Sequence, residues 1–271
     1  MHLVIRHVTQ YRYDRPVPYA AQAVRLAPTS NSHQRVLSWW VTDGAGRALP
    51  ASTDGYGNLL HVRTIVRAHS ESALCAEGEV ETSESDGVLR GVKERLPPLF
   101  FLRTTPLTEP DTAAREIAAK VAGEADPVRR LHDLMLVIRE RIDYVTGTTN
   151  VSTTVAEAIA HGQGVCQDHA QVFVACARLL GHPARYVSGY MWPGPDPAGA
   201  EAAHAWAEAR IEDLGWVGFD PANRICPTEA YVRVATGLDY LEAAPVRGVR
   251  RGAAEEELAV TVEVQQRQSQ Q

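Results

Sequence analysis

The sequence predicts an α+β protein in which a β-sandwich-like N-terminal domain precedes a domain of helices packed on an antiparallel sheet. Residues 1–100 alternate apolar and polar side chains with the period of a strand, and residues 111–180 repeat apolar side chains with the period of a helix. Alternation then returns in residues 184–264. Helices followed by strands in this order are typical of α+β domains.

Short alternating runs account for the N-terminal domain, which we place at residues 1–100. The first run puts one set of side chains on a common face: Leu3, Ile5, His7, Thr9, Tyr11 and Tyr13. The runs RVLSWWVT and NLLHVRTIVRA follow, separated by the turn clusters TDGAGR and TDGYGN. We expect a proline-rich linker at 101–110, a second domain at 111–264 that includes a C-terminal strand, and a disordered tail at 265–271.

Capping residues locate the helices of the second domain. Asp111 is expected to cap one helix, and Asp126 followed by Pro127 to begin the next. The second helix carries a buried stripe at helical spacing: Leu131, Leu134, Met135, Ile138 and Ile142. A third helix is bounded by the capping box from Thr154 to Glu157 and by Gly162.

Composition argues against several classes of function. The net charge of −6 is unsuited to a partner with many phosphates, so no nucleic acid is expected. No apolar run approaches the ~20 residues of a membrane span, and the first residues lack the apolar stretch of a signal peptide. We therefore expect a cytoplasmic protein with no membrane partner. The four cysteines form no CxxC pair, which argues against a zinc ribbon or a disulfide framework.

The segment GQGVCQDHA, residues 162–170, places one of these cysteines in an unusual setting. A helix is predicted from Cys166 to Leu180, so that Cys166 lies in its first turn. The partial positive charge of a helix N-terminus favours a thiolate there. The same backbone N–H groups can hold the oxyanion of a tetrahedral intermediate. Cys166 is thus a candidate nucleophile.

A cysteine nucleophile needs a base and a group that orients the base. His204 lies within the alternating run AHAWAEARI, and Asp220 ends the run GWVGFD before a proline turn. The short separation between these runs suits a hairpin, which would place the two side chains on neighbouring strands. His204 and Asp220 are therefore the candidate partners of Cys166.

Three motifs, GVCQDHA, HAWAEA and GWVGFDPAN, with ARYVSGY between the first two, together resemble the transglutaminase-like superfamily, specifically its bacterial cytoplasmic branch. RHVTQYRYDRPV and DGYGN resemble the β-rich N-terminal domain that accompanies this core, and DYLEAAPVRGV resembles its closing segment. One position departs from the expected pattern, since Leu238 stands where we expect an arginine.

The resemblance implies a papain/transglutaminase-like core with Cys166 as nucleophile, His204 as general base and acid, and Asp220 as the group that orients His204. It implies acyl transfer at an amide bond of a peptide or protein through a thioester, without a cofactor. Hydrolysis is favoured over transfer to an amine. Two rival interpretations stay open: a binding module that keeps the fold without turnover, and a zinc enzyme in which His169 joins the three residues.

Other residues are candidates for substrate contacts or for structural roles. Tyr144, Gln167 and Trp206 are candidates for oxyanion or substrate contacts, although Tyr144 and Trp206 suit a core or cleft wall equally well. Asp168 is expected to stabilise the first helical turn through the helix dipole. The remaining cysteines are expected to pack in the interior: Cys75, Cys176 and Cys226.

Overall fold

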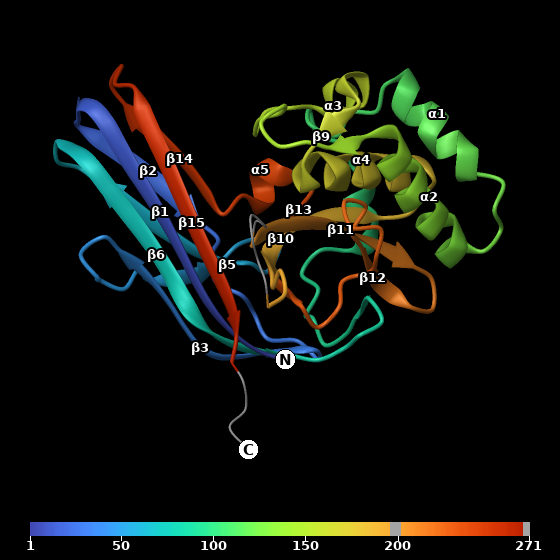
Figure 1. The fold of residues 1–271 in the computed structure, drawn as a ribbon, viewed down its shortest axis with the longest axis horizontal. Coiled ribbons are helices and arrows are strands. Elements are labelled where there is room, and N and C mark those ends of the chain that lie inside the picture. Colours follow the sequence, from blue (N-terminus) through green and yellow to red (C-terminus); the bar gives the residue numbers. More distant parts are fainter. Residues whose placement is uncertain (196–201, 268–271) are drawn as a thin grey trace.

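The computed structural model describes residues 1–195 and 202–267. Figure 1 shows two lobes, one built of long strands and one in which helices α1 to α4 cover a sheet. No helix in the described ranges is long and apolar enough to cross a membrane. The predicted α+β class, with a papain/transglutaminase-like core and a β-rich N-terminal part, is confirmed.

The β lobe consists of two four-stranded antiparallel sheets with the strand orders β15-β1-β6-β3 and β14-β2-β5-β4. The strands have the following bounds: β1 His2–Val17, β2 Tyr19–Val24, β3 Gln34–Asp43, β4 Ala51–Thr53, β5 Leu59–Ile65, β6 His69–Thr82, β14 Val246–Arg251 and β15 Glu256–Gln266. Apolar side chains fill the space between the sheets: Val24, Leu26, Ala27, Val41, Leu74 and Ala76. The predicted face of β1 is the buried one.

The C-terminal strand differs from its predicted place in the domain at 111–264. Strand β15 pairs antiparallel with β1 along nearly its whole length, and β14 pairs with β2. Both strands therefore complete the β lobe. The physical reason is that β1 would otherwise be a long unpaired edge, and Val264 finds an apolar partner opposite Ile5. Pairing between the two ends of a chain leaves no local signal in the sequence.

The mixed lobe is built on an antiparallel sheet with the order β13-β10-β11-β12-β7. Its strands are β7 Val88–Leu89, β10 Ala184–Met191, β11 Ala203–Ile211, β12 Gly215–Phe219 and β13 Tyr231–Gly237. The two short strands β8 Asp143–Tyr144 and β9 Gln163–Gly164 pair in parallel. The helices are α1 Thr112–Val121, α2 Pro127–Arg141, α3 Val155–His161, α4 Cys166–Leu179 and α5 Tyr240–Ala243, with a 3-10 turn, η1, at Pro98–Leu102.

The predicted helix boundaries are confirmed by their caps. Asp111 accepts a hydrogen bond from the N–H of Ala114, and Asp126 accepts one from Val128 ahead of helix α2. Thr154 and Glu157 form the capping box of α3. Gly162 ends α3 with a φ of 65°, a conformation that glycine adopts at little cost.

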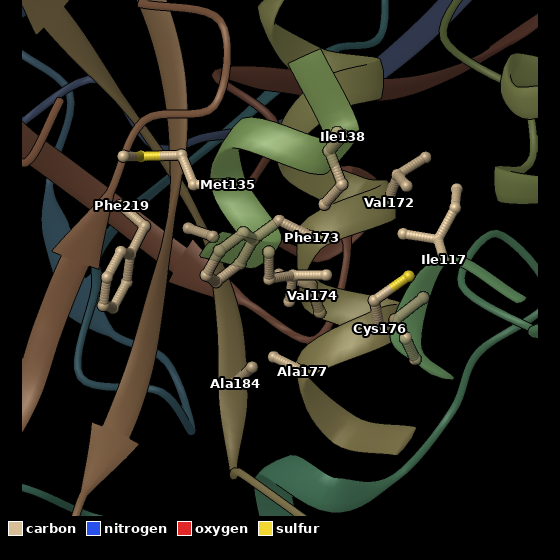
Figure 2. Close-up of a cluster of buried hydrophobic side chains, with 14 of the residues drawn as sticks. Ile117, Met135, Ile138, Val172, Phe173, Val174, Cys176, Ala177, Ala184 and Phe219 are labelled. Atoms are coloured by element: carbon tan, nitrogen blue, oxygen red, sulfur yellow. The ribbon is translucent and has the colours of Figure 1, made fainter. Parts of the chain in front are cut away.

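Helix α4 runs through the centre of the mixed lobe and is buried on all sides from Asp168 to Arg178. Figure 2 shows Phe173 of α4 against Phe219 of β12, with ring centroids 5.1 Å apart. The other side of the helix meets Ile138 of α2 and Ile117 of α1. Alanines along β11 let the helix lie close to the sheet. The nucleophile candidate thus opens the most extensively buried helix of the lobe.

The segment 101–110, predicted as a linker, is packed into the mixed lobe. Phe101 is 2% exposed and meets Trp216 edge to face, with ring centroids 5.2 Å apart. The buried guanidinium of Arg178 donates hydrogen bonds to the carbonyl of Phe101 and to the hydroxyl of Thr108. Beyond the 3-10 turn η1 this segment forms neither helix nor strand, yet its prolines do not prevent burial.

The lobes are also joined through other contacts, so residues 1–100 do not stand alone. Strand β7 belongs to the sheet of the mixed lobe. The Gln34 side chain donates to the carbonyl of Arg233 at 2.8 Å. The predicted disordered tail at 265–271 begins within β15, and Arg267 forms an ion pair with Glu79 at 3.0 Å. Residues 268–271 lie outside the described residues.

Candidate active site

The residues around Cys166 determine where helix α4 begins. The carboxylate of Asp168 accepts hydrogen bonds from the N–H of Val165 at 2.8 Å and from the hydroxyl of Thr149 at 2.7 Å. Gly164 leaves room for this carboxylate, because a Cβ atom there would lie 2.7 Å from Asp168 Oδ2. The predicted role of Asp168 in the first turn is confirmed, and it accounts for the glycine before the nucleophile candidate.

Helix α4 presents backbone N–H groups beside the thiol. The backbone N–H groups of Asp168 and His169 both donate hydrogen bonds to the carbonyl of Val165. The N–H groups of Cys166 and Gln167 come before the first intrahelical hydrogen bond and therefore point out of the helix end. They carry the partial positive charge of the helix N-terminus, which suits a thiolate or an oxyanion.

Strands β11 and β12 bring the other two predicted residues together. Nε2 of His204 lies 2.6 Å from Oδ2 of Asp220. Both side chains are buried, and Asp220 is 0% exposed. The pairing of Ala207 with Phe219 shows that the two strands are neighbours, as the hairpin argument predicted.

Two further side chains complete the surroundings of Asp220. The hydroxyl of Tyr231 donates to Asp220 Oδ2 at 2.7 Å, and the amide of Asn223 donates to the same oxygen at 2.8 Å. Burial by itself would raise the pKa of Asp220, but the hydrogen bonds from His204, Tyr231 and Asn223 hold it below its usual range. Sequence reasoning did not place these two residues there. Asn223 follows Asp220 in the same turn, which is a weak signal, and Tyr231 reaches it from β13.

Nε2 of His204 is hydrogen-bonded to Asp220, and Cys166 lies near enough to interact with the same ring. Burial alone would lower the pKa of His204, yet the hydrogen bond to Asp220, followed by the interaction with Cys166, raises it to about 10. The imidazolium form is therefore favoured beside the thiol at neutral pH. A cationic histidine beside a cysteine is one of the settings in which a cysteine acts as a nucleophile.

The residues predicted as oxyanion or substrate contacts take different places. Trp206 is 3% exposed and stacks on His204 with ring centroids 6.4 Å apart, so that it supports the ring from the same strand. The Gln167 side chain donates to the carbonyl of Asn150 at 3.4 Å. Tyr144 is 37% exposed and stacks on His169, which excludes the alternative interpretation of Tyr144 as a core residue.

His169 supports the helix start and does not join the three residues. Its Nδ1 lies 2.8 Å from the carbonyl oxygen of Val165 and its Nε2 lies 2.9 Å from that of Ile142. Both ring nitrogens are thus engaged by backbone oxygens. Within residues 1–195 and 202–267, no group of three or more His, Cys, Asp or Glu side chains is placed to hold a metal ion.

Residues 115–221 match the family model of the transglutaminase-like superfamily, and residues 3–81 match the bacterial transglutaminase-like N-terminal region. The chain therefore belongs to the transglutaminase-like superfamily. It is 32% identical over 270 residues to an uncharacterized protein of Mycobacterium tuberculosis, covering 90% of this chain and 86% of the relative.

Two further proteins are similar to this chain over different extents. A protein-glutamine gamma-glutamyltransferase of Pseudomonas aeruginosa is 32% identical over 101 residues, which is 32% of this chain and 14% of that protein. The crystal structure of a proposed cysteine protease from Cytophaga hutchinsonii has a similar fold, with a TM-score of 0.78 and 18% identity. That likeness covers 100% of this chain and 92% of the other.

Cys166 is expected to react with iodoacetamide at neutral pH much faster than the other three thiols. Burial raises the pKa of Cys176 to about 12 and that of Cys226 to about 11. Burial and then the charge of Glu77 raise the pKa of Cys75. Competitive alkylation of the folded protein with peptide mapping measures the four rates. The matched control is His204→Ala, which should slow labelling of Cys166 alone, and equal labelling of Cys75 would contradict the expectation.

Proposed function

We propose that this protein catalyses cysteine-dependent acyl transfer at an amide bond of a peptide or protein, with water as the main acceptor. The observation that carries the proposal is the hydrogen bond from His204 to the buried Asp220, with Cys166 at the start of helix α4 beside the same histidine. A cysteine, a histidine and a carboxylate in this order are the parts of a thiol-dependent acyltransferase or hydrolase. We also propose that the reaction takes place in the cytoplasm.

The first half of the reaction forms a thioester. The sulfur of Cys166 attacks the carbonyl carbon, and the resulting oxyanion accepts hydrogen bonds from backbone N–H groups at the start of α4. His204 gives its proton to the amide nitrogen as the carbon–nitrogen bond breaks, and the amine leaves. Asp220 stabilises the imidazolium before this step and holds the ring in one orientation.

The second half of the reaction needs His204 as a base. Part of the rise in its pKa comes from Cys166, and this part is lost once the sulfur is bound in the thioester. His204, now neutral, takes a proton from water as the water oxygen attacks the thioester carbon. The carbon–sulfur bond then breaks, and the acid and the thiolate are regenerated. His204 can thus serve as an acid in the first half of the reaction and as a base in the second half.

Transfer to an amine is the second candidate function, because the Pseudomonas aeruginosa relative is named as a glutamyltransferase. The fold likeness to a proposed cysteine protease spans the whole chain and favours water. A primary amine differs from water only in the second half of the reaction. The two candidates therefore share the same acyl-enzyme.

Mass spectrometry of the protein after brief exposure to a peptide library is expected to find an acyl group on Cys166. Rapid acid quenching preserves the thioester, and Cys166→Ser serves as the inactive control. Added glycine ethyl ester then measures how the acyl group divides between water and amine. A folded protein whose Cys166 reacts with iodoacetamide but never carries an acyl group would support the binding-module alternative.

A further inference from the structure

A groove of about 390 Å³, here called the sandwich groove, lies at the open side of the β lobe. Its floor consists of inner-face side chains of β1 and β2, among them Tyr11, Tyr13 and Gln22. Its rims are β14 and β15, which are the edge strands of the two sheets. Figure 1 shows β14 and β15 on the side of the β lobe that faces helix α5. The volume is within the ~300–1,000 Å³ typical of ligand sites.

The sandwich groove extends to the neighbourhood of the nucleophile candidate. Tyr240 of helix α5 lines the groove and also belongs to the apolar cluster that contains Cys166. Val151 lines the groove as well, and it follows Asn150, whose carbonyl accepts a hydrogen bond from Gln167. The groove is therefore bordered by Tyr240, which packs against the cluster of Cys166, while Cys166 itself does not line the groove.

The rim formed by β15 is apolar and uncovered. Leu258 and Val260 lie opposite Tyr11 and Thr9 on the inner face of the sheet. Tyr11 and Thr9 are 9% and 2% exposed, whereas Leu258 and Val260 are 53% and 51% exposed. As an edge strand, β15 also presents unpaired backbone N–H and C=O groups. An extended peptide satisfies both features, because it supplies backbone groups and alternating side chains together.

The other rim carries positive charge in a protein whose net charge is −6. Arg250 forms an ion pair with Glu256 at 3.3 Å. Arg247 also borders the groove and has no ion-pair partner among the residues described. Its register opposite Ala23 places its exposed side chain on the outer side of this rim, where it can bind a carboxylate of a chain that crosses the edge of the sheet.

We propose that the sandwich groove binds an extended polypeptide segment of the substrate that carries apolar side chains and a carboxylate. The segment pairs with the edge of the sandwich, places apolar side chains on Leu258 and Val260, and pairs its carboxylate with Arg247. This inference rests on the proposed function and extends it, because it makes the β lobe a part of substrate selection. The enzyme would then prefer unfolded, acidic polypeptides over short amides.

Binding of fluorescein-labelled casein, an unfolded acidic polypeptide, to the Cys166→Ser protein tests the groove without any turnover. Leu258→Asp and Arg247→Glu are each expected to raise the Kd by about tenfold or more, since each removes a contact worth roughly one factor of ten. The matched controls are Ala259→Asp on the outer face of β15 and Arg251→Glu outside the groove, which should leave the Kd unchanged. Melting temperatures of all four variants show that the fold is kept.

The outcomes separate the groove from the chemistry. Failure of casein to bind, or equal weakening by Leu258→Asp and Ala259→Asp, would overturn the groove whatever the acyl-enzyme experiment gives. Casein binding with the expected pattern but no acyl group on Cys166 would leave the groove standing and overturn the proposed reaction. With Cys166 restored, the groove variants should lower kcat/KM on casein and not on a tripeptide anilide.

Discussion

Asp220→Asn is expected to lower kcat by about 10²–10⁴ while the protein stays folded, the scale seen when the orienting carboxylate of a triad is lost. The asparagine amide cannot stabilise the His204 imidazolium and can present an N–H where the ring needs an acceptor. Tyr231 and Asn223 both donate to Asp220, so an amide in its place also meets two donors. Steady-state kinetics on a peptide substrate beside a thermal melt measures the effect.

The pH profile distinguishes this effect from general damage. The pKa of His204 is raised to about 10, so its imidazolium form persists at neutral pH and is lost as the pH rises through about 10. In Asp220→Asn this alkaline limb of kcat/KM should move to lower pH, because the largest contribution that raises the pKa is removed. Asp168→Asn, a carboxylate change in the first turn of helix α4, is the control and should leave the limb in place. Near-normal turnover by a folded Asp220→Asn protein would remove Asp220 from the proposed triad.

Glu208→Gln is expected to destabilise the protein by about 3–5 kcal/mol, the usual cost of leaving buried charges without their partner. Glu208 is 2% exposed and accepts from Arg185 at 2.6 Å and from Arg233 at 2.7 Å. Arg185 itself is 2% exposed and lies 3.9 Å from the ring centroid of Trp216, and after the substitution it keeps only the ion pair with Glu94 at 3.0 Å. Chemical denaturation measured against wild type gives the difference in the free energy of unfolding.

Because of the Glu208 carboxylate, we expect the free energy of unfolding to fall at acidic pH. Burial alone would raise the pKa of Glu208, but Arg233 and Arg185 lower it to about 2. The stabilisation is therefore complete above the ordinary glutamate value near 4.5 and is lost as the pH falls from there toward 2. Glu208→Gln should make the free energy of unfolding less dependent on pH between about 4.5 and 2. Glu77→Gln, in an exposed pair with Arg6, is the matched control and should cost no more than about 1 kcal/mol.

The residues of the candidate site were predictable because each has a local signature. Cys166 follows a glycine and opens a helix whose pattern is read within a few turns, and Gly164 and Asp168 belong to the same short segment. His204 and Asp220 lie on two strands joined by a tight turn, so their approach follows from a hairpin. The caps at Asp111, Asp126 and Thr154 are local in the same way.

Other features depended on contacts between distant segments. Tyr231 reaches Asp220 from β13, and no periodicity in that strand indicates which side chain it will meet. The segment 101–110 contains the signals of a linker, yet Phe101 is buried because Trp216 and Leu238 offer it an apolar surface. Phe101 lies in the 3-10 turn η1, which is too short to show a repeating pattern in the sequence.

The sequence by itself determined the α+β class and the helix starts and supplied the three residues of the proposed triad as a prediction, because caps, periods and short motifs act over a few residues. Only the tertiary structure decided that β14 and β15 close the β lobe, since that pairing joins segments more than two hundred residues apart. It also decided that the open side of the sandwich meets helix α5 near Cys166. Edge pairing and burial are set by the partners that the whole chain brings together, so neither can be read from one strand alone.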